Sequence, residues 1–589
     1  MEKYLGIAVI GFPWLGGLCV WLIGDKNPRF LHKLASIFAA AGGLFSLTLL
    51  PIISDEIILS IPLGSVFGDF TLIADGLGVS LAIIAAVIGG LAVIYSSDYM
   101  KDEVQLGRYY SLTMFFIGAM IALVLSGSLL FIFIFWEITA FCSYALISFH
   151  NDDPKAVAGG IKALIITQVG GIGLLAASLI SYSLFGSYQI NTFLSQATQI
   201  PVTVLSLCAF GCLVAAAAKS AQVPFQTWLP DAMEAPTPIS ALIHAATMVN
   251  AGVYLLARFY PGFEYVGGWK TAVILVGLLS ALLAALMALV SQDLKRVLAY
   301  STISQLGYMV YAVGCGAIIA SQFHLLSHSI FKALLFLCAG ALIQAIGTRD
   351  MYQMEGLGRK MPFVRAAFII ASLALVGLPI TNGFFSKEMV LEGGFKLGPA
   401  WAYVGMLLGV GITSLYTIRM VSLVFYRRTG TDKEIHEAPR VMRFVLGVLA
   451  FGVLTTWLLI GTFSQLYADS LPFHILHSED LVVVIVEIFS SPWTYLALGM
   501  VFLGLLVWIM RSKFTKLTQT LAPGALFIRQ GFGFEKINQL IIRSINNTAG
   551  SLRKLQTGQL NWNLVGIVLG LVVVLLFAAW VGYHGNTTF

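Results

Sequence analysis

The chain has 589 residues, of which 58% are hydrophobic and 11% charged, and its mean hydropathy is +0.89. A soluble domain carries about 25% charged residues, so this composition excludes a water-soluble protein. The 40 Phe, 21 Tyr and 11 Trp exclude a disordered one. The formal charge is only +6, and no basic patch with interleaved aromatic residues occurs, which excludes a nucleic-acid partner.

Apolar stretches long enough to cross a bilayer recur along the chain. One span needs roughly 20 apolar residues, and the two-residue alternation of a β-barrel is largely absent. The sequence therefore predicts an all-α polytopic membrane protein with about sixteen transmembrane helices. They are expected at 5–23, 31–51, 77–97, 109–126, 128–149, 163–185, 202–220, 239–260, 271–291, 297–316, 318–346, 364–382, 399–425, 442–466, 481–510 and 562–582.

The connections between the spans carry two local features and a strong charge bias. Residues 57–73 contain Pro62, Gly64 and Gly68 between β-rich runs and predict an extracytoplasmic hairpin. The odd-numbered loops hold 26 of the 34 basic residues, which places them in the cytoplasm and both termini outside. The first apolar stretch has no small-residue cleavage site, so it is interpreted as a span and not as a signal peptide. We expect an integral protein of a prokaryotic inner (plasma) membrane.

The 511–561 interval is the only long connection. Its 534–555 portion has apolar residues on one side and basic residues beside them, which predicts an amphipathic, cytoplasmic lateral helix along the membrane or along neighbouring spans. The alternative is an ordinary loop that contains a short helix. The final span would follow within 562–589.

The cysteines and the known cofactor motifs indicate no cofactor or metal in this chain. All six cysteines fall in apolar stretches, and Cys208 and Cys212, one helical turn apart, have no further ligand nearby to complete a metal site. Buried thiols that pack as small apolar groups are the simpler interpretation. No iron–sulfur, haem, flavin, nucleotide or Walker fingerprint occurs. We therefore expect no catalytic redox site in this chain.

Ionisable residues inside the predicted spans are the candidate functional residues. A charge at bilayer depth costs at least about 2.5–3.5 kcal/mol, so each needs a reason to be there. The main candidates are Glu137, Lys219, His244, His324, His328, Lys332 and Lys387. His324, His328 and Lys332 recur every four residues and would share one helix face. Such a row predicts a proton relay, since imidazole titrates near neutrality; the alternative is a set of core residues hydrogen-bonded to neighbouring helices.

Helix-breaking prolines stand near two of these lysines. Pro224 follows Lys219 by five residues, and Pro379 precedes Lys387 by eight. Broken helices are tolerated at membrane depth where they line a cavity or are buried in protein. If spans 4–8 and 9–13 were repeats, spans 7 and 12 would be equivalent, and an odd number of spans would invert the copies. The sequence therefore predicts six divisions of the chain. They are helices 1–3 with the hairpin (1–108), a first repeat (109–260), a second repeat (271–425), spans 14 and 15 (442–510), the lateral-helix region (511–561) and the last span (562–589).

Four segments, 219–258, 294–309, 324–336 and 383–389, resemble the antiporter-like subunits of respiratory complex I (chain-5 type), membrane-bound hydrogenases and Mrp-type Na⁺/H⁺ antiporters. The resemblance covers most of the chain and implies ion translocation by two inverted five-helix repeats with broken seventh and twelfth helices. It implies proton-translocation roles for eight residues: Glu137, Lys219, His244, Lys295, His324, His328, Lys332 and Lys387. Lys295 would lie near the cytoplasmic end of the central axis, and Lys387 would lead to the exit side.

The chain departs from the chain-5 pattern in two places. Gln168 and Gly171 stand where chain-5-type subunits usually carry an arginine and an aspartate, as in many Mrp-type chains, and the lateral helix is short. The resemblance implies partners: related antiporter-like membrane subunits, the lipid bilayer and H⁺ or Na⁺. Iron–sulfur, flavin or nickel–iron centres would belong to partner subunits.

Three functions remain open. The first is a proton-translocating subunit of a redox-driven complex, of the NADH/quinone or the ferredoxin/hydrogenase type. The second is a subunit of an Mrp-type Na⁺/H⁺ antiporter, and the third is a scaffold clamped by the lateral helix. A Na⁺ site would require clustered carboxylates and carbonyls, and Glu137 is the only clear mid-span carboxylate, which favours protons.

Overall fold

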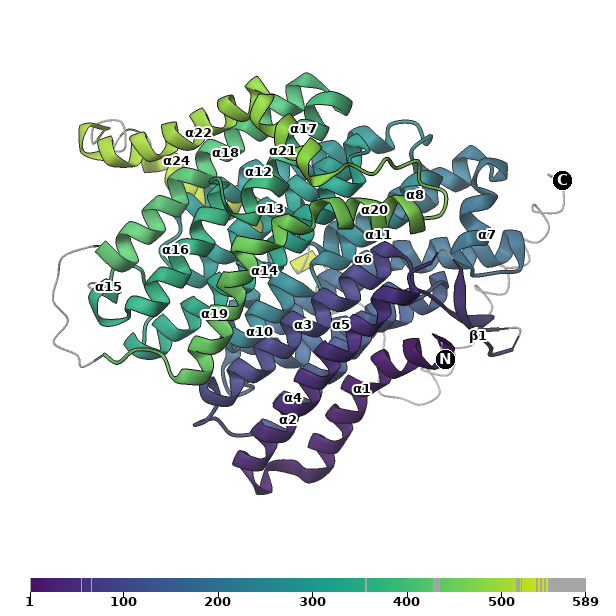
Figure 1. The fold of residues 1–589 in the computed structure, drawn as a ribbon, viewed down its shortest axis with the longest axis horizontal. Helices are drawn as coiled ribbons and strands as arrows, with labels where there is room; N and C mark the ends of the chain where they lie inside the picture. Colours follow the sequence, from purple (N-terminus) through teal and green to yellow (C-terminus); the bar gives the residue numbers. More distant parts are fainter. Residues whose placement is uncertain are drawn as a thin grey trace. The chain divides into compact units, whose positions relative to one another are not determined.

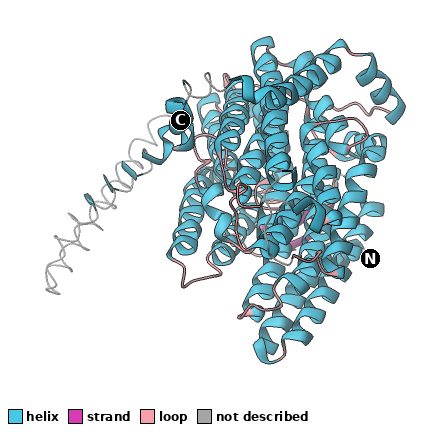
Figure 2. Ribbon diagram, turned by 90° about the vertical axis from the view of Figure 1, so that its left-hand side faces the viewer, coloured by secondary structure: helices cyan, strands magenta, loops and turns pink. Residues whose placement is uncertain are grey.

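The computed structural model describes residues 2–54, 56–64, 66–354, 357–426, 435–514, 520, 522–536, 539–540, 543–544 and 547–548. The chain divides into two compact units, one ending at Arg529 and one beginning at Gln530. Helices dominate the described residues (Figure 1), and the two short strands are shown in magenta among them in Figure 2.

The first half of the chain folds into helices and one β-hairpin. In order they are α1 (Glu2–Ile23), α2 (Pro28–Ser46), β1 (Ile57–Pro62), β2 (Asp69–Ile73), α3 (Gly76–Tyr99), α4 (Leu106–Leu125), α5 (Leu129–Ile147), α6 (Pro154–Phe185), α7 (Ile190–Ser195), α8 (Val202–Lys219), α9 (Trp228–Asp231), α10 (Thr237–Ala241), α11 (Asn250–Phe263) and α12 (Trp269–Val290).

The second half is helical throughout its described residues. In order the helices are α13 (Leu294–Cys315), α14 (Ile318–Ile346), α15 (Leu357–Lys360), α16 (Pro362–Val376), α17 (Asn382–Leu397), α18 (Ala400–Val421), α19 (Arg440–Thr455), α20 (Ile460–Ser470), α21 (Leu481–Ser490), α22 (Pro492–Ile509) and α24 (Ala522–Arg529).

The predicted fold class is confirmed, with differences in how spans are built. Thirteen helical stretches of the described chain are long and apolar enough to cross a membrane. Fifteen of the sixteen predicted spans fall on described residues, and two of these are not among the thirteen. The tenth is α13, a 22-residue helix whose polar residues lower its apolar character, and the twelfth is divided into α16 and α17.

Other predicted segments have different outcomes. The continuous span predicted at 481–510 is wrong in one respect, because α21 ends at Ser490 and Pro492 begins α22; proline has no N–H to continue the first helix. Residues 534–536, 539–540, 543–544 and 547–548 of the predicted lateral helix are helical, and the rest of it lies outside the described residues, as does the span at 562–582. The inverted relation of 109–260 and 271–425 stays a prediction.

The predicted hairpin at 57–73 is present. β1 and β2 pair antiparallel, with Ser60 opposite Thr71 and Pro62 opposite Asp69. Gly64 and Gly68 both have positive φ (88° and 64°), which favours glycine, and they close the turn through a Gly68 N–H bond to the Gly64 carbonyl. The hairpin is tied to the helices because the Gly127 N–H donates to the Thr71 carbonyl at 2.9 Å.

Helix α14 occupies the middle of the first unit. It packs against α3, α10, α13, α16, α17 and α19 (Figure 1). Nearly all its residues from Ile318 to Leu342 are buried, including its two histidines and its lysine. A helix buried on all sides makes its polar residues available only to other helices, and never to lipid.

A fixed ion pair joins the start of α3 to α11. Asp75 caps α3 by accepting the Gly78 N–H at 2.8 Å, and its carboxylate receives both terminal nitrogens of Arg258. The Arg258 Nε donates to the Tyr254 hydroxyl at 3.3 Å, and that hydroxyl donates to the Val124 carbonyl. Both charged side chains are buried, so each one depends on the other for its stability.

We predict that Asp75→Asn lowers the free energy of unfolding by about 3–5 kcal/mol, because Asn keeps the helix cap but leaves the buried guanidinium without a counter-charge. The measurement is the thermal unfolding midpoint of the protein in mild detergent, followed by tryptophan fluorescence. Asp152→Asn, at an exposed carboxylate, is the control, and Asp75→Asn/Arg258→Met should recover most of the loss. An unchanged midpoint for Asp75→Asn would contradict a stabilising pair.

Candidate functional site

Lys219 is the last residue of α8 and is fully buried. Its ammonium donates a hydrogen bond to the Trp136 carbonyl of α5 at 2.7 Å and lies 4.9 Å from the centre of the Trp136 ring. Because Glu137 and Lys219 both fall in the predicted repeat at 109–260, the sequence predicts Glu137 as the carboxylate partner of Lys219, but the structure has no ion pair between them within 4.0 Å. Glu137 contacts Gln168 of α6 and interacts with Lys219 only at longer range.

The helix break after Lys219 is stabilised by side chains that donate hydrogen bonds to backbone carbonyls around it. The Trp228 indole donates to the Ala218 carbonyl at 2.9 Å. The Gln222 side-chain amide donates to the Ser220 carbonyl and to the Ile303 carbonyl of α13. A helix end inside a membrane needs such partners because lipid supplies none. The predicted interruption of the seventh span is therefore present and is bonded to α13.

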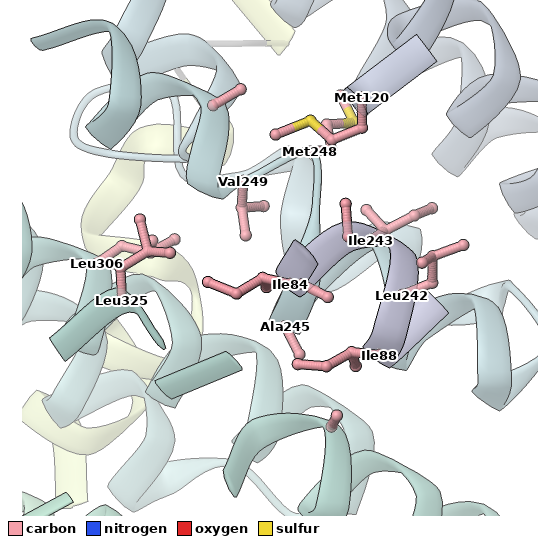
Figure 3. Close-up of a cluster of buried hydrophobic side chains, with 14 of the residues drawn as sticks. Ile84, Ile88, Met120, Leu242, Ile243, Ala245, Met248, Val249, Leu306 and Leu325 are labelled. Atoms are coloured by element: carbon pink, nitrogen blue, oxygen red, sulfur yellow. The ribbon is translucent and has the colours of Figure 1, made fainter. Parts of the chain in front are cut away.

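His244 lies in a π-helical turn, Leu242–Ala246, between α10 and α11. Its ring lies between Trp228 (centroids 6.4 Å apart) and Phe336 (5.8 Å), and neither ring nitrogen has a hydrogen-bond partner among the described residues. Figure 3 shows the apolar packing around this turn, where Leu242, Ile243 and Ala245 meet Ile84 and Ile88 of α3. The wide turn places the imidazole in a fully buried setting between aromatic rings.

Lys295, near the start of α13, is held by hydrogen bonds to two backbone carbonyls. Its ammonium donates to the carbonyls of Ala235 (2.7 Å) and Met233 (3.2 Å), where the short α9 segment and the turn after it end. It also interacts electrostatically with His244. Lys295 is thus held by backbone oxygens and not by a carboxylate, and His244 lies near enough to interact with its charge.

Glu234, between those two carbonyl groups, forms a bidentate ion pair with Arg349. The two bonds are 3.0 Å and 2.7 Å long, and the pair is largely buried. Burial acts to raise the pKa of Glu234, but the hydrogen bonds and positive charge of Arg349, with Lys295, outweigh it and lower that pKa below its ordinary value. The pair fixes the turn that holds Lys295.

The three titratable residues of α14 lie in one row, as their spacing predicted, and α13 supplies their partners. Lys332 donates to the Ser301 hydroxyl, and one ring nitrogen of His324 bonds to the Gln305 side-chain oxygen at 3.1 Å. The other His324 nitrogen bonds to Ser386 of α17 at 2.9 Å. His328, between them on the row, has no hydrogen-bond partner among the described residues.

Lys387 follows Ser386 and closes the row. α16 ends at Val376, Gly377 has φ +88°, and α17 starts at Asn382, so the twelfth span is broken as predicted. The Lys387 ammonium donates to the freed Leu375 carbonyl at 2.7 Å and the Val376 carbonyl at 3.2 Å. It also lies 5.9 Å from the ring of Tyr308 on α13.

The structure thus assembles the predicted residues into three groups. They are Glu137 with Lys219; Lys295 with His244; and Lys332, His328 and His324 with Lys387. Asn250 links the second group's helix to the third, since its amide donates to the Ala245 carbonyl and to Ser329 of α14. No direct bond between Lys219 and the α14 row occurs among the described residues.

Sequence reasoning missed the residues of α13 that contact the row. Ser301, Gln305 and Tyr308 recur on one face of α13, and each contacts a member of the row. The signal was available, because polar residues recur at one-turn spacing in a helix otherwise buried among apolar neighbours. Glu388 was also missed: it is buried beside Lys387 and bonds to Thr494 of α22.

The described residues contain no group of three or more His, Cys, Asp and Glu side chains arranged to hold a metal ion. A groove of about 330 Å³ lies at the start of α13, the helix that carries Lys295, and its lining includes Asp293, Arg296 and Asp350 but not Lys295 itself. The arrangement suits proton movement between neutral and charged nitrogen groups.

Comparisons with known proteins identify the family of this chain. The profile described as "NADH:quinone oxidoreductase/Mrp antiporter, TM" matches residues 126–413, and that described as "NADH-Ubiquinone oxidoreductase (complex I), chain 5 N-terminus" matches 61–110. NADH-quinone oxidoreductase subunit L of Pseudomonas aeruginosa is 37% identical over 469 residues, which cover 78% of this chain and 74% of that protein.

Two further proteins are similar. F(420)H(2) dehydrogenase subunit L of Methanosarcina mazei is 39% identical over 428 residues, which cover 65% of this chain and 63% of that one. The solved structure of the Mrp complex from Dietzia sp. contains a chain that superposes with a TM-score of 0.80 at 26% identity, over 98% of this chain and 63% of that one. The chain thus spans under two thirds of the length of these two relatives.

We predict that Glu234→Gln destabilises the protein by about 1–3 kcal/mol at neutral pH, since it removes a charged hydrogen-bond partner of Arg349. Because the pKa of Glu234 is lowered by folding, its contribution is present above the unfolded value of about 4.3 and is lost as the pH falls through the folded value. Thermal midpoints of wild type and variant should therefore differ most above about pH 5 and converge in acid. Glu56→Gln, at an exposed carboxylate, is the control, and a gap that persists in acid would contradict the assignment.

Proposed function

Because the chain belongs to the family of membrane subunits shared by NADH:quinone oxidoreductases and Mrp antiporters, we propose that it moves protons as the antiporter-like subunit of a redox-driven respiratory complex. The observation that carries the proposal is the buried row of Lys332, His328 and His324 that ends at Lys387. Each of these groups can exchange protons, and polar side chains stand beside the row: Ser301 contacts Lys332, and Gln305 and Ser386 contact His324.

The lysines are suited to release protons because their ammonium groups rest on backbone carbonyls or a hydroxyl. Lys387 and Lys295 each bind two carbonyls, and Lys219 binds one. A proton can leave such a site without separating an ion pair, whereas a lysine in a tight salt bridge would stay charged. A change of charge or hydration beside Glu137 would alter Lys219 first and then the groups beyond it.

The groove at the start of α13 supports proton uptake at that end, and Lys387 supports release at the other. In the orientation that the basic loops favour, uptake would be from the cytoplasm of a prokaryotic cell and both chain termini would lie outside. Electron donor, acceptor and any iron–sulfur, flavin or nickel–iron centre would belong to partner subunits, which would include related antiporter-like chains.

A subunit of an Mrp-type Na⁺/H⁺ antiporter is the second candidate. The match to a chain of the Mrp complex over 98% of this chain favours it, as do Gln168 and Gly171 in α6. The two candidates use the same residues but different driving forces. The two candidates can be distinguished by whether electron transfer or a Na⁺ gradient drives proton movement.

We predict that the complex isolated from its membrane in mild detergent contains subunits with flavin or iron–sulfur absorbance. In sealed vesicles, NADH with a quinone, or reduced ferredoxin, should drive proton movement. An imposed Na⁺ gradient that drives protons equally well without any electron donor, in a complex that has no such absorbance, would replace the first candidate by the second.

We predict that Lys219→Ala and Lys387→Ala each lower the rate of proton movement in vesicles at least tenfold, because the loss of one proton carrier would interrupt the proton path. Lys387→Arg should be as impaired as Lys387→Ala, since a guanidinium keeps its charge but does not release its proton. Lys155→Gln, on the exposed start of α6, is the matched control. Normal transport by Lys387→Arg would show that Lys387 supplies charge only and does not carry the proton.

A further inference from the structure

A groove with an unusual combination of charge and apolar surface lies between α16 and α19, away from the buried row. It has a volume of about 550 Å³ and is lined by Phe363, Arg440, Arg443, Phe444, Gly447, Val448 and Phe451. The arginines occupy the first turn of α19, and Phe363 is near the start of α16. The groove therefore begins at the end of two membrane helices and continues along them.

The arginines at the head of this groove have no ion pair among the described residues. Arg440 and Arg443 take part in none of the salt bridges of the described chain, and the Arg443 Nε is buried without a hydrogen-bond partner. The nearest described carboxylate along the chain, Glu437, is occupied: its two oxygens accept the N–H groups of Phe363 (2.7 Å) and Ala438 (3.0 Å). The Glu437 carboxylate thus caps α16 and forms no ion pair with either arginine, and no other described carboxylate does so.

Their position makes this lack of an anion costly. The N-terminus of a helix carries partial positive charge, so two arginines in the first turn of α19, with no acidic residue there, are unfavourable unless an anion joins them. By contrast, Lys155 in the first turn of α6 has an anion at hand, because Asp153 caps that turn and accepts the Lys155 N–H at 2.9 Å. The start of α19 is therefore arranged to receive an anion from outside the chain.

The rest of the groove is apolar and accessible. Phe444 and Phe451 are 62% and 68% exposed, and with Val448 they form one helical stripe that extends about 10 Å from the arginines. Gly447 forms the floor, where an added Cβ would meet only the Phe363 ring, at 3.7 Å. A charged head at the helix ends and an apolar wall inward match an amphiphile that lies in one leaflet.

We propose that this groove binds an anionic phospholipid, with its phosphate between Arg440 and Arg443 and an acyl chain along Phe444, Val448 and Phe451. Basic pockets at the ends of membrane helices attract anionic headgroups, each arginine contributing about a fivefold gain in affinity. A zwitterionic lipid would fill the apolar part but would gain less from the two charges.

The test uses the complex isolated in mild detergent and a short-chain phosphatidylglycerol with a fluorophore on one acyl chain. Binding is followed by fluorescence anisotropy and by competition with unlabelled phosphatidylglycerol, phosphatidylcholine of the same chains, and inorganic phosphate. The wild type should prefer phosphatidylglycerol. Arg440→Gln/Arg443→Gln should weaken phosphatidylglycerol about 30-fold and leave phosphatidylcholine unchanged.

Gly447→Leu is an independent variant that keeps both charges and fills the groove, so it should weaken both lipids. Lys155→Gln, which removes a positive charge from a helix start that already has its anion, should bind as the wild type does. Unchanged phosphatidylglycerol affinity in the double arginine variant would overturn the proposal. Competition by inorganic phosphate as strong as by the lipid would also overturn it, as would release of a neighbouring subunit from Gly447→Leu without loss of lipid.

Discussion

Backbone carbonyls that leave helical hydrogen bonding accept two of the buried lysines, Lys295 and Lys387, and the organisation of the site depends on this exchange. Lys387 binds the last carbonyls of α16, and Lys295 binds those at the end of the α9 segment. A freed carbonyl needs a donor and a buried ammonium needs acceptors, and lipid provides neither. Helix breaks and lysines are therefore found together because each removes the cost of the other.

The protein uses buried charge in a second, different way at Asp75 and Arg258. That pair is bidentate and buried, and an arginine does not give up its proton, so the pair is fixed. It lies at the start of α3 and on α11, which continues the helix that carries His244. The Asp75–Arg258 ion pair thus fixes helices beside the groups that are proposed to carry protons. The structural ion pair and the proposed proton carriers are different residues.

The sequence was sufficient for the fold class, the hairpin and most span positions, because apolar length and proline positions determine them locally. The i, i+4, i+8 spacing of His324, His328 and Lys332 also predicted their common face correctly. The partners on α13 could not be predicted, since the pairing of Ser301 with Lys332 and of Gln305 with His324 depends on how two helices pack. Likewise, the place of Glu137 and Lys219 in the same predicted repeat favoured an ion pair between them, but the Lys219 ammonium donates to the carbonyl of Trp136, the residue before Glu137.

The bond of Lys219 to a carbonyl in place of a carboxylate also affects which groups could lie at the two ends of the proposed proton path. Two carboxylates near Lys219 and Lys387 contact other groups: the half-buried Glu137 contacts Gln168, and the buried Glu388 contacts Thr494. Glu137 adjoins Lys219 in the first group, and Glu388 adjoins Lys387 in the last. Glu388 is therefore the next residue after Lys387 in the chain, and Glu137 interacts electrostatically with Lys219. A carboxylate in such a place changes the electrostatic environment of its lysine through small movements, without a salt bridge to break. In the proposed proton path, the interior would then consist of nitrogen groups with neutral hydroxyl and amide groups beside them, and the two acids would act at its ends.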